Sequence, residues 1–325
     1  MTFYRSLLVS IIALLLGLAV LNFVTSSTLL SLFTQAIIYA VFALGIGVLL
    51  KQNGMVSFGH ALYFGSAGYL LGIMLQLQWA SAETLIFYTL FIITLVGLLF
   101  GLIIVRVPGV AFGMLTLAIG QMFYLTASRA RGFTGGADGM NIDWPSTLFG
   151  FSVSQILKPS VIFMISWTTL IVVIFLVSCL LRSRFGAITE AVRDNEERAR
   201  FIGISTLLPR AAIYSLSALI SGVAGVLSAL NTGFVSPENL HWSLSGMTLM
   251  MVVVGGFKVL WGPALGAVVY FMFKDILGDY ATHWMTIFGV VLIAVIVFSP
   301  TGIAGAIVGW MSGKPSVGNK PAQGH

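Results

Sequence analysis

Residues 182–210 read RSRFGAITEAVRDNEERARFIGISTLLPR and separate two long apolar regions of the chain. This segment holds ten of the 26 charged residues, six basic and four acidic. Only 8% of all residues are charged and 58% are hydrophobic, whereas soluble domains carry about a quarter charged residues. The sequence therefore predicts a polytopic membrane protein in which the charged middle segment lies in water and meets a soluble partner.

The apolar regions on both sides divide into hydrophobic stretches that are joined by short links. A helix needs about 20 apolar residues to cross the hydrocarbon core of a bilayer. We therefore expect an all-α polytopic transmembrane helical bundle of about ten spans, with broken or re-entrant segments. The expected spans are Leu7–Phe23, Leu29–Leu50, Met55–Leu77, Leu85–Val105, Val110–Ala127, Ser160–Leu181, Ala211–Leu230, Leu244–Gly255, Ala264–Leu277 and Trp284–Phe298.

The positions of Lys and Arg predict which loops face the cytoplasm. With the N-terminus inside, twelve basic residues lie on one side of the membrane and four on the other. Cytoplasmic loops carry the excess of basic residues, so both termini and the 182–210 segment are expected in the cytoplasm. The net charge of +6 has the same origin and does not indicate nucleic-acid binding. The first apolar run is longer than a signal-peptide core, so we expect a retained first helix.

We expect one transmembrane domain over residues 1–312, which includes the 182–210 loop. Residues 313–325 are polar and rich in Pro and Gly, which is typical of a disordered tail. Glycines four residues apart predict close contacts between helices, because small residues let backbones approach in lipid. These pairs are Gly68/Gly72, Gly97/Gly101, Gly109/Gly113 and Gly262/Gly266.

Two polar, glycine-containing stretches interrupt the apolar pattern. They are residues 53–60, NGMVSFGH, and residues 255–263, GGFKVLWGP. Non-helical backbone in a membrane is tolerated only where protein or a water-filled cavity covers it. Interrupted segments at corresponding positions in two halves of a chain indicate a transport pathway and an internal repeat. We expect the pathway near residues 53–60; the similarity between the two stretches is weak, so the repeat stays open.

Few polar side chains fall within the expected spans. For His60, a hydrogen bond to the backbone of the broken segment and a role in solute binding are both open. Lys274 and Asp275 are expected to reach toward the membrane interface. The sequence contains no relay of buried acids, no metal-ligand cluster and no P-loop motif, so we expect no ATP site, no cofactor and no catalysis in this chain.

The charged segment has helical periodicity. Ile188, Ala191 or Val192, Asn195, Ala199 and Ile202 recur at spacings of three and four, which predicts a helix with a narrow apolar stripe. Mixed charges surround this stripe, whereas lipid-surface anchors are strongly basic. The pattern favours a helix that binds a groove on a protein partner; a solvated loop helix is the alternative.

The chain resembles the LivM-type inner-membrane permease subunits of branched-chain amino acid ABC transporters. The resemblance covers nearly the whole chain except the tail, and its motifs are specific only jointly. The motifs are GMVSFGHA at 54–61, TGGADG at 134–139, SRFG at 183–186 with RDNE at 193–196 and GI at 203–204, GG at 255–256 with LWGPALG at 260–266, and FSPTGI at 298–303.

The resemblance implies a multi-pass permease domain in the bacterial inner membrane. Implied partners are a homologous second permease subunit, two ATP-binding cassette ATPase subunits that hold the ATP, a periplasmic solute-binding protein and membrane lipid, and no nucleic acid. The 182–210 loop would couple to an ATPase cleft through Glu190, Val192, Arg193, Asp194, Glu196, Arg198 and Gly203. The translocation pathway would involve Asn53, Ser57, Gly59, His60, Gln121 and Trp261.

The expected solute is a branched-chain or other neutral amino acid. Urea or short amides are the alternative within the same class, because related permeases serve those solutes with similar motifs. An ion-coupled secondary transporter is the alternative from another class, and it predicts buried acids that the sequence lacks.

Overall fold

The computed structural model describes residues 2–23, 26–78, 80–145, 147–148, 150–278, 284–299 and 301–311. The expected tail, 313–325, lies outside the described residues. Every expected span contains a helix, so the all-α bundle is confirmed. These helices are α1 (Thr2–Phe23), α2 (Ser27–Asn53), α3 (Ala61–Leu77), α4 (Ala82–Ile104), α5 (Gly109–Arg129), α8 (Pro159–Leu181), α11 (Leu207–Thr232), α12 (Trp242–Gly255), α13 (Gly262–Gly278) and α14 (Trp284–Phe298).

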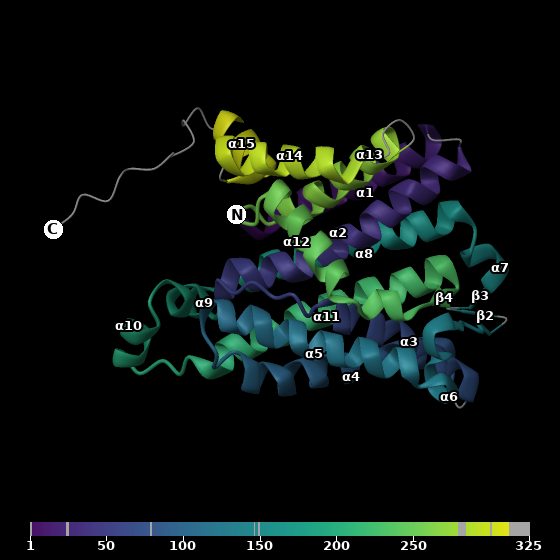
Figure 1. Cartoon of the computed structure of the whole chain (residues 1–325). Helices are drawn as coiled ribbons and strands as arrows, with labels where there is room; N and C mark the ends of the chain where they lie inside the picture. The colour runs from purple at the N-terminus through teal and green to yellow at the C-terminus, as the bar shows by residue number, and fades with distance from the viewer. Residues whose placement is uncertain are drawn as a thin grey trace.

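Shorter elements gather at the two ends of the bundle. One end carries α9 and α10, and we call it the charged end; the opposite end carries most of the short strands, and we call it the strand end (Figure 1). The shorter elements are α6 (Arg131–Thr134), η1 (Gly136–Asp138), β1 (Met140–Asn141), β2 (Thr147–Leu148), β3 (Phe151–Ser152), α7 (Val153–Ile156), α9 (Arg184–Asp194), α10 (Glu196–Phe201), β4 (Phe234–Val235), η2 (Pro237–Leu240) and α15 (Gly302–Met311).

Fewer helices than the ten expected spans are long enough to cross a membrane. Within the described residues, α2, α4, α5, α8 and α11 are long and apolar enough to cross a bilayer. The bent pair α14 and α15 raises this number to six, and α1, α3 and α12 contain shorter apolar helices. The bundle is therefore polytopic, whereas ten crossings and cytoplasmic termini stay predictions.

Helices α2 and α11 form the centre of the bundle. Helix α11 packs against α2, α3 and α4, and α2 also packs against α8 and α13. Small residues permit these contacts. A Cβ at Gly97 of α4 would approach the Ala218 methyl group of α11, and one at Gly225 would overlap the carbonyl oxygen of Phe64 in α3. Small-residue packing is how helices associate in lipid, where apolar side chains gain little from leaving the solvent.

Helix α4 shows how the bundle faces its surroundings. Phe87, Phe91 and Ile103 recur four or more residues apart and are 68%, 57% and 66% exposed. Leu85 and Ile93 lie on the opposite face and are buried against the bundle. An exposed stripe of large apolar side chains on a long apolar helix is typical of contact with lipid.

Short strands close the strand end. β1 pairs with β4 in antiparallel register, with Met140 opposite Val235, and β2 pairs with β3. The glycine-rich turn at 132–139 packs onto this structure, because a Cβ at Gly139 would overlap the Val235 carbonyl oxygen. These two-residue strands are small exceptions to the expected all-helical chain. The β1–β4 pair joins the 128–158 loop to the 234–240 segment, which the sequence did not predict.

Candidate functional site

The charged segment folds as two short helices. Between α9 and α10, Asn195 is extended with φ −157° and ψ 100°. Its Oδ1 accepts a 2.8 Å hydrogen bond from the Arg198 N–H. Asn is a favoured N-cap because its side chain satisfies an amide that has no partner in the first helical turn. The single amphipathic helix expected over this segment is therefore wrong, since the chain starts a second helix at Asn195.

The expected apolar stripe is also divided. Val192 and Ala199 are 1% and 3% exposed, so both pack against the chain itself. Phe201 and Ile202 are 89% and 71% exposed at the end of α10. We call this pair the α10 tip. The α10 tip therefore presents exposed apolar surface at the charged end, whereas Val192 is unavailable to a partner in this conformation.

Helix α9 is bound to the last turn of α2. The Thr189 hydroxyl donates a 2.7 Å hydrogen bond to Gln52 Oε1, and Arg193 Nη1 donates one of 2.6 Å to the Lys51 carbonyl oxygen. The Arg193 guanidinium also pairs with Asp194 at 2.6 Å. The last carbonyl groups of a helix have no partner within it. Arg193 therefore caps α2 and ties the charged segment to the centre of the bundle.

Glu196 joins α10 to the start of α11. Its carboxylate lies 2.6 Å from both Arg200 Nη2 and Arg210 Nη1, and it accepts a 3.0 Å hydrogen bond from the Thr206 hydroxyl. Burial by itself raises the pKa of the Glu196 carboxyl. The Thr206 hydroxyl and the guanidinium groups of Arg210 and Arg200 favour the charged form, and together they hold this pKa below its ordinary value.

The structure brings the expected coupling residues together at the charged end. Glu190, Asp194 and Arg198 have exposed side chains, and Gly203 follows α10 with φ +84°. Arg193 and Glu196 are instead engaged within the chain, as described above. Contact between any of these residues and an ATPase stays a prediction.

The 54–60 segment is non-helical, as the sequence predicted. Gly54 follows α2 in the left-handed conformation with φ +66°, which glycine adopts at low cost. A Cβ at Gly59 would overlap the Thr116 carbonyl oxygen of α5. The Phe58 N–H donates a 3.2 Å hydrogen bond to the Thr116 hydroxyl. Helix α5 therefore covers this backbone and satisfies one of its polar groups, as non-helical structure in a membrane requires.

His60 is fully buried, and both ring nitrogens have partners. Nδ1 lies 2.7 Å from Ser57 Oγ, and Nε2 lies 2.8 Å from Ser217 Oγ. Ser217 donates its proton to the Gly45 carbonyl oxygen at 2.6 Å, so it accepts from Nε2. Ser57 Oγ accepts from the Gly59 N–H and donates to Nδ1. This pattern assigns the neutral Nε2–H tautomer. The hydrogen-bond partners of the His60 ring are thus two hydroxyl groups. The expectation that this ring bonds to the backbone of the broken segment is wrong.

The other expected pathway residues lie in different parts of the bundle. Asn53 Nδ2 donates a 3.0 Å hydrogen bond to the Arg210 carbonyl oxygen at the charged end. Gln121 in α5 has a buried Oε1 without a hydrogen-bond partner among the described residues. Trp261 precedes α13 and is 38% exposed. Solute contact by Asn53, Ser57, Gly59, His60, Gln121 and Trp261 stays a prediction.

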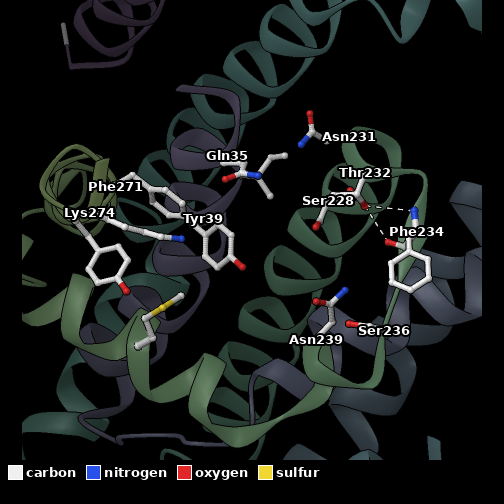
Figure 2. Close-up of a pocket in the computed structure, with 13 residues that line it drawn as sticks. Gln35, Tyr39, Ser228, Asn231, Thr232, Phe234, Ser236, Asn239, Phe271 and Lys274 are labelled. Atoms are coloured by element: carbon white, nitrogen blue, oxygen red, sulfur yellow. Dashed lines mark hydrogen bonds between the residues drawn. The ribbon is translucent and has the colours of Figure 1, made fainter. Parts of the chain in front are cut away.

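A polar cavity of about 300 Å³ lies in the half of the bundle toward the strand end. Its walls come from α2, α11, α12, α13 and residues 234–239, and polar side chains from several of these segments surround it (Figure 2). Lys274 lines this cavity, and its reach toward the membrane interface stays a prediction. The sequence contained one signal for this cavity. Gln35 and Tyr39 lie four residues apart, and so do Tyr270 and Lys274, which places each pair on one helix face.

A second cavity of about 620 Å³ adjoins the polar cavity, and we call it the side cavity. The two share Tyr39, Asn239, Met247 and Tyr270. The side cavity reaches α14 and includes Glu238 from η2. The described part of the chain contains no group of three or more His, Cys, Asp or Glu side chains that could hold a metal ion.

Comparisons with known proteins agree with this architecture. Residues 28–300 match the family described as branched-chain amino acid transport system / permease component. The high-affinity branched-chain amino acid transport system permease protein LivM of Salmonella typhimurium is 25% identical over 86% of this chain and 71% of the relative. LivM of Escherichia coli is 25% identical over 90% of this chain and 74% of the relative.

A relative with another named solute also matches. The autoinducer 2 import system permease protein LsrC of Escherichia coli is 28% identical over 85% of this chain and 80% of the relative. No solved structure shows a significant match. Because the family match spans most of the chain, this protein belongs to the family of permease components of branched-chain amino acid transport systems.

Proposed function

We propose that this chain carries a branched-chain or other neutral amino acid across the bacterial inner membrane. It acts as a permease subunit of an ABC importer and has no ATPase site of its own. The observation that carries the proposal is the family match over residues 28–300, together with the LivM relatives that match most of this chain. The polar cavity supports it, because small polar solutes need hydrogen-bonding groups to replace water inside a membrane protein.

In this proposal the charged end meets an ATPase subunit that hydrolyses the ATP. The α10 tip inserts into a cleft of that subunit, because two large apolar side chains this exposed on a water-facing loop gain most by burial in a protein partner. The exposed charges of Glu190, Asp194 and Arg198 surround this contact and set its orientation. The hydrogen bonds from Thr189 and Arg193 then carry movement of α9 to α2.

The complete importer in this proposal contains a homologous second permease, two ATPase subunits and a periplasmic solute-binding protein. The charged end faces the cytoplasm, as the Lys and Arg distribution predicts. The strand end then faces the periplasm and receives the solute. The pathway runs from the polar cavity toward the 53–60 segment, where Ser57, Gly59 and His60 contact the solute in a more open conformation than this one.

Co-purification from the native membrane tests the proposal. The chain should retain ATPase subunits, and the reconstituted complex should accumulate leucine, isoleucine or valine in proteoliposomes when ATP and a loaded binding protein are present. Uptake of urea or a short amide in place of these amino acids would show that the solute belongs to the alternative class. Uptake driven by an ion gradient without any ATPase subunit would overturn the proposal.

A narrower test addresses the α10 tip. Phe201→Ser with Ile202→Ser should abolish retention of the ATPase subunits and leave the yield of folded chain unchanged, since both side chains are largely exposed. Phe133→Ser is the matched control, because Phe133 is 77% exposed at the strand end. Equal ATPase retention by the two variants would show that the α10 tip is not the docking surface.

A further inference from the structure

A cavity of about 340 Å³ lies at the charged end, between the link from α4 to α5 and the start of α11, and we call it the basic cavity. Among the described residues, the charged members of its lining are three arginines and one acid: Arg106, Arg200, Arg210 and Glu196. The lining therefore has a net charge of +2. Cationic side chains that converge on one cavity repel one another, and an anion that enters the cavity offsets this repulsion.

Arg106 has donors available for such an anion. Its Nε donates a 3.0 Å hydrogen bond to the Leu102 carbonyl oxygen at the end of α4. Its two Nη groups have no hydrogen-bond or ion-pair partner in the part of the chain that the structure describes. The N–H groups of a guanidinium are arranged in a plane that matches two oxygens of a carboxylate or phosphate group. Arg106 is therefore oriented by one nitrogen and can bind an anion with the other two.

The two other arginines share Glu196 and also have unused donors. Arg200 Nη2 and Arg210 Nη1 each lie 2.6 Å from a different oxygen of the Glu196 carboxylate. Arg200 Nε donates a 3.3 Å hydrogen bond to the Thr206 hydroxyl, and its Nη1 has no partner among the described residues. Arg210 Nε is buried, and it too has no hydrogen-bond partner within the described residues. One carboxylate thus neutralises one of these two positive charges, and the second charge stays unbalanced.

The start of α11 favours an anion in the same place. Thr206 and Leu207 line the basic cavity where this 26-residue helix begins. The Thr206 side chain does not cap the helix, because its hydroxyl donates to Glu196. The first amide groups of a helix have no partner within it, and the helix dipole attracts negative charge to that end. The basic cavity therefore combines guanidinium groups with a helix start, as many phosphate-binding sites do.

The exposed face of α4 indicates what carries the phosphate. Leu95, Leu99 and Ile103 follow one another at spacings of four and are exposed on the side of α4 that faces lipid. Val105 keeps the helical backbone conformation, so Arg106 lies about one turn beyond Ile103 on the same side. A phospholipid whose acyl chains lie along this stripe has its phosphate beside Arg106. Basic cavities between transmembrane helices are typical binding sites for anionic lipid headgroups.

We propose that the basic cavity binds the phosphate of an anionic phospholipid from the leaflet at the charged end, and that this lipid holds α10 against the start of α11. A net negative headgroup is favoured over a zwitterionic one because the lining has surplus positive charge. Arg106 and Arg200 bind the phosphate, while Glu196 keeps its contact with Arg210. The proposal does not depend on which solute the chain transports, and it makes the position of α10 sensitive to the lipid composition of the membrane.

The test titrates the full chain, purified and delipidated in a neutral detergent, with phosphatidylglycerol or with phosphatidylcholine. Native mass spectrometry counts the bound lipid molecules. The unaltered chain should bind phosphatidylglycerol more tightly than phosphatidylcholine. Arg106→Gln should weaken phosphatidylglycerol binding roughly tenfold, the effect of losing one charge-assisted hydrogen bond. Arg106→Lys should restore it to within about threefold, since the charge is kept.

Arg184→Gln is the matched control, because Arg184 is an exposed arginine at the charged end that does not line the basic cavity. Its phosphatidylglycerol affinity should equal that of the unaltered chain. An equal loss of affinity in Arg106→Gln and Arg184→Gln, or equal affinity of the unaltered chain for the two lipids, would overturn the site. Inorganic phosphate in large excess should not displace phosphatidylglycerol, since it lacks the acyl chains; displacement would overturn the lipid as the ligand.

A second measurement tests the effect on α10. Phosphatidylglycerol should slow amide hydrogen exchange over residues 196–206 in the unaltered chain, and phosphatidylcholine should not. The same lipid should have no effect on this segment in Arg106→Gln. Exchange that is unchanged by phosphatidylglycerol in the unaltered chain would overturn the role of the lipid in holding α10.

Discussion

The Arg193 guanidinium donates a 2.6 Å hydrogen bond to the carbonyl oxygen of Lys51 in the last turn of α2. Helix α2 continues from this contact through the centre of the bundle to Tyr39, about 20 Å away at 1.5 Å per residue. Tyr39 lines both cavities. A single buried helix therefore connects the charged segment to the candidate solute site, which is the geometry that an ATP-driven permease needs.

Breaking this contact should uncouple ATP hydrolysis from transport. In Arg193→Met the α2 carbonyl loses its cap, while the α10 tip stays exposed for docking. We expect leucine uptake to fall roughly tenfold, the effect of one lost hydrogen bond to a charged group, with ATPase retention unchanged. Uptake and ATP hydrolysis are measured on the same proteoliposomes. Arg184→Gln removes a charge from the exposed start of α9 and should leave both unchanged; an equal loss in both variants would contradict the capping role.

Glu196 should hold α10 in place in a pH-dependent manner. Glu196→Gln removes the charge that binds Arg200 and Arg210 and should destabilise the docked α10 by about 2 kcal/mol. Faster amide hydrogen exchange over residues 196–206 would report this change. The pKa of Glu196 in the folded chain lies below its ordinary value of 4.5. The stabilisation of α10 by the Glu196 carboxylate is therefore complete above pH 4.5, and it is lost as the pH falls through the folded pKa. The unaltered chain should therefore approach the variant in strongly acidic buffer; a difference that persisted there would contradict the assignment.

The sequence predicted the helices well because long apolar runs are a local signal. It also contained a local signal for the break at Asn195, since Asn followed by Glu196 and Glu197 is typical of a helix start; the apolar periodicity obscured it. The cavities were not predictable in this way. Gln35 and Lys274 line one cavity from segments far apart in the chain, and the pairing of α2 with α13 follows only from three-dimensional packing.

The hydrogen-bond network of His60 also joins residues that are far apart in the chain. Its partner Ser217 lies on α11, far along the chain, so the sequence left the role of His60 open. His60→Ala should leave the hydroxyl of Ser57 buried without its acceptor and should destabilise the chain by about 2–3 kcal/mol. Thermal unfolding in detergent measures this loss. The double variant with Ser217→Ala should lose less than the sum of the single variants, because the two residues share one network.

His241→Ala is the matched control for that series. His241 lies at the strand end, where its side chain accepts a hydrogen bond from the Ser243 N–H as the N-cap of α12, so its removal should cost about 1 kcal/mol, less than the loss expected for His60→Ala. A His60→Ala chain as stable as the His241→Ala chain would contradict the network derived from the two hydroxyl contacts.

Two glycines should respond in opposite directions to the same added methyl group. A Cβ at Gly225 would overlap the carbonyl oxygen of Phe64, whereas one at Gly246 in α12 would meet no atom within 4 Å. Backbone cannot rotate away as a side chain can, so Gly225→Ala must separate α3 from α11 and should cost about 1–3 kcal/mol. Gly246→Ala should instead be neutral or stabilise by up to about 1 kcal/mol, because alanine favours the helix. The thermal unfolding temperatures of both variants test this prediction. Equal shifts in unfolding temperature would show that α3 and α11 are not in close contact at Gly225.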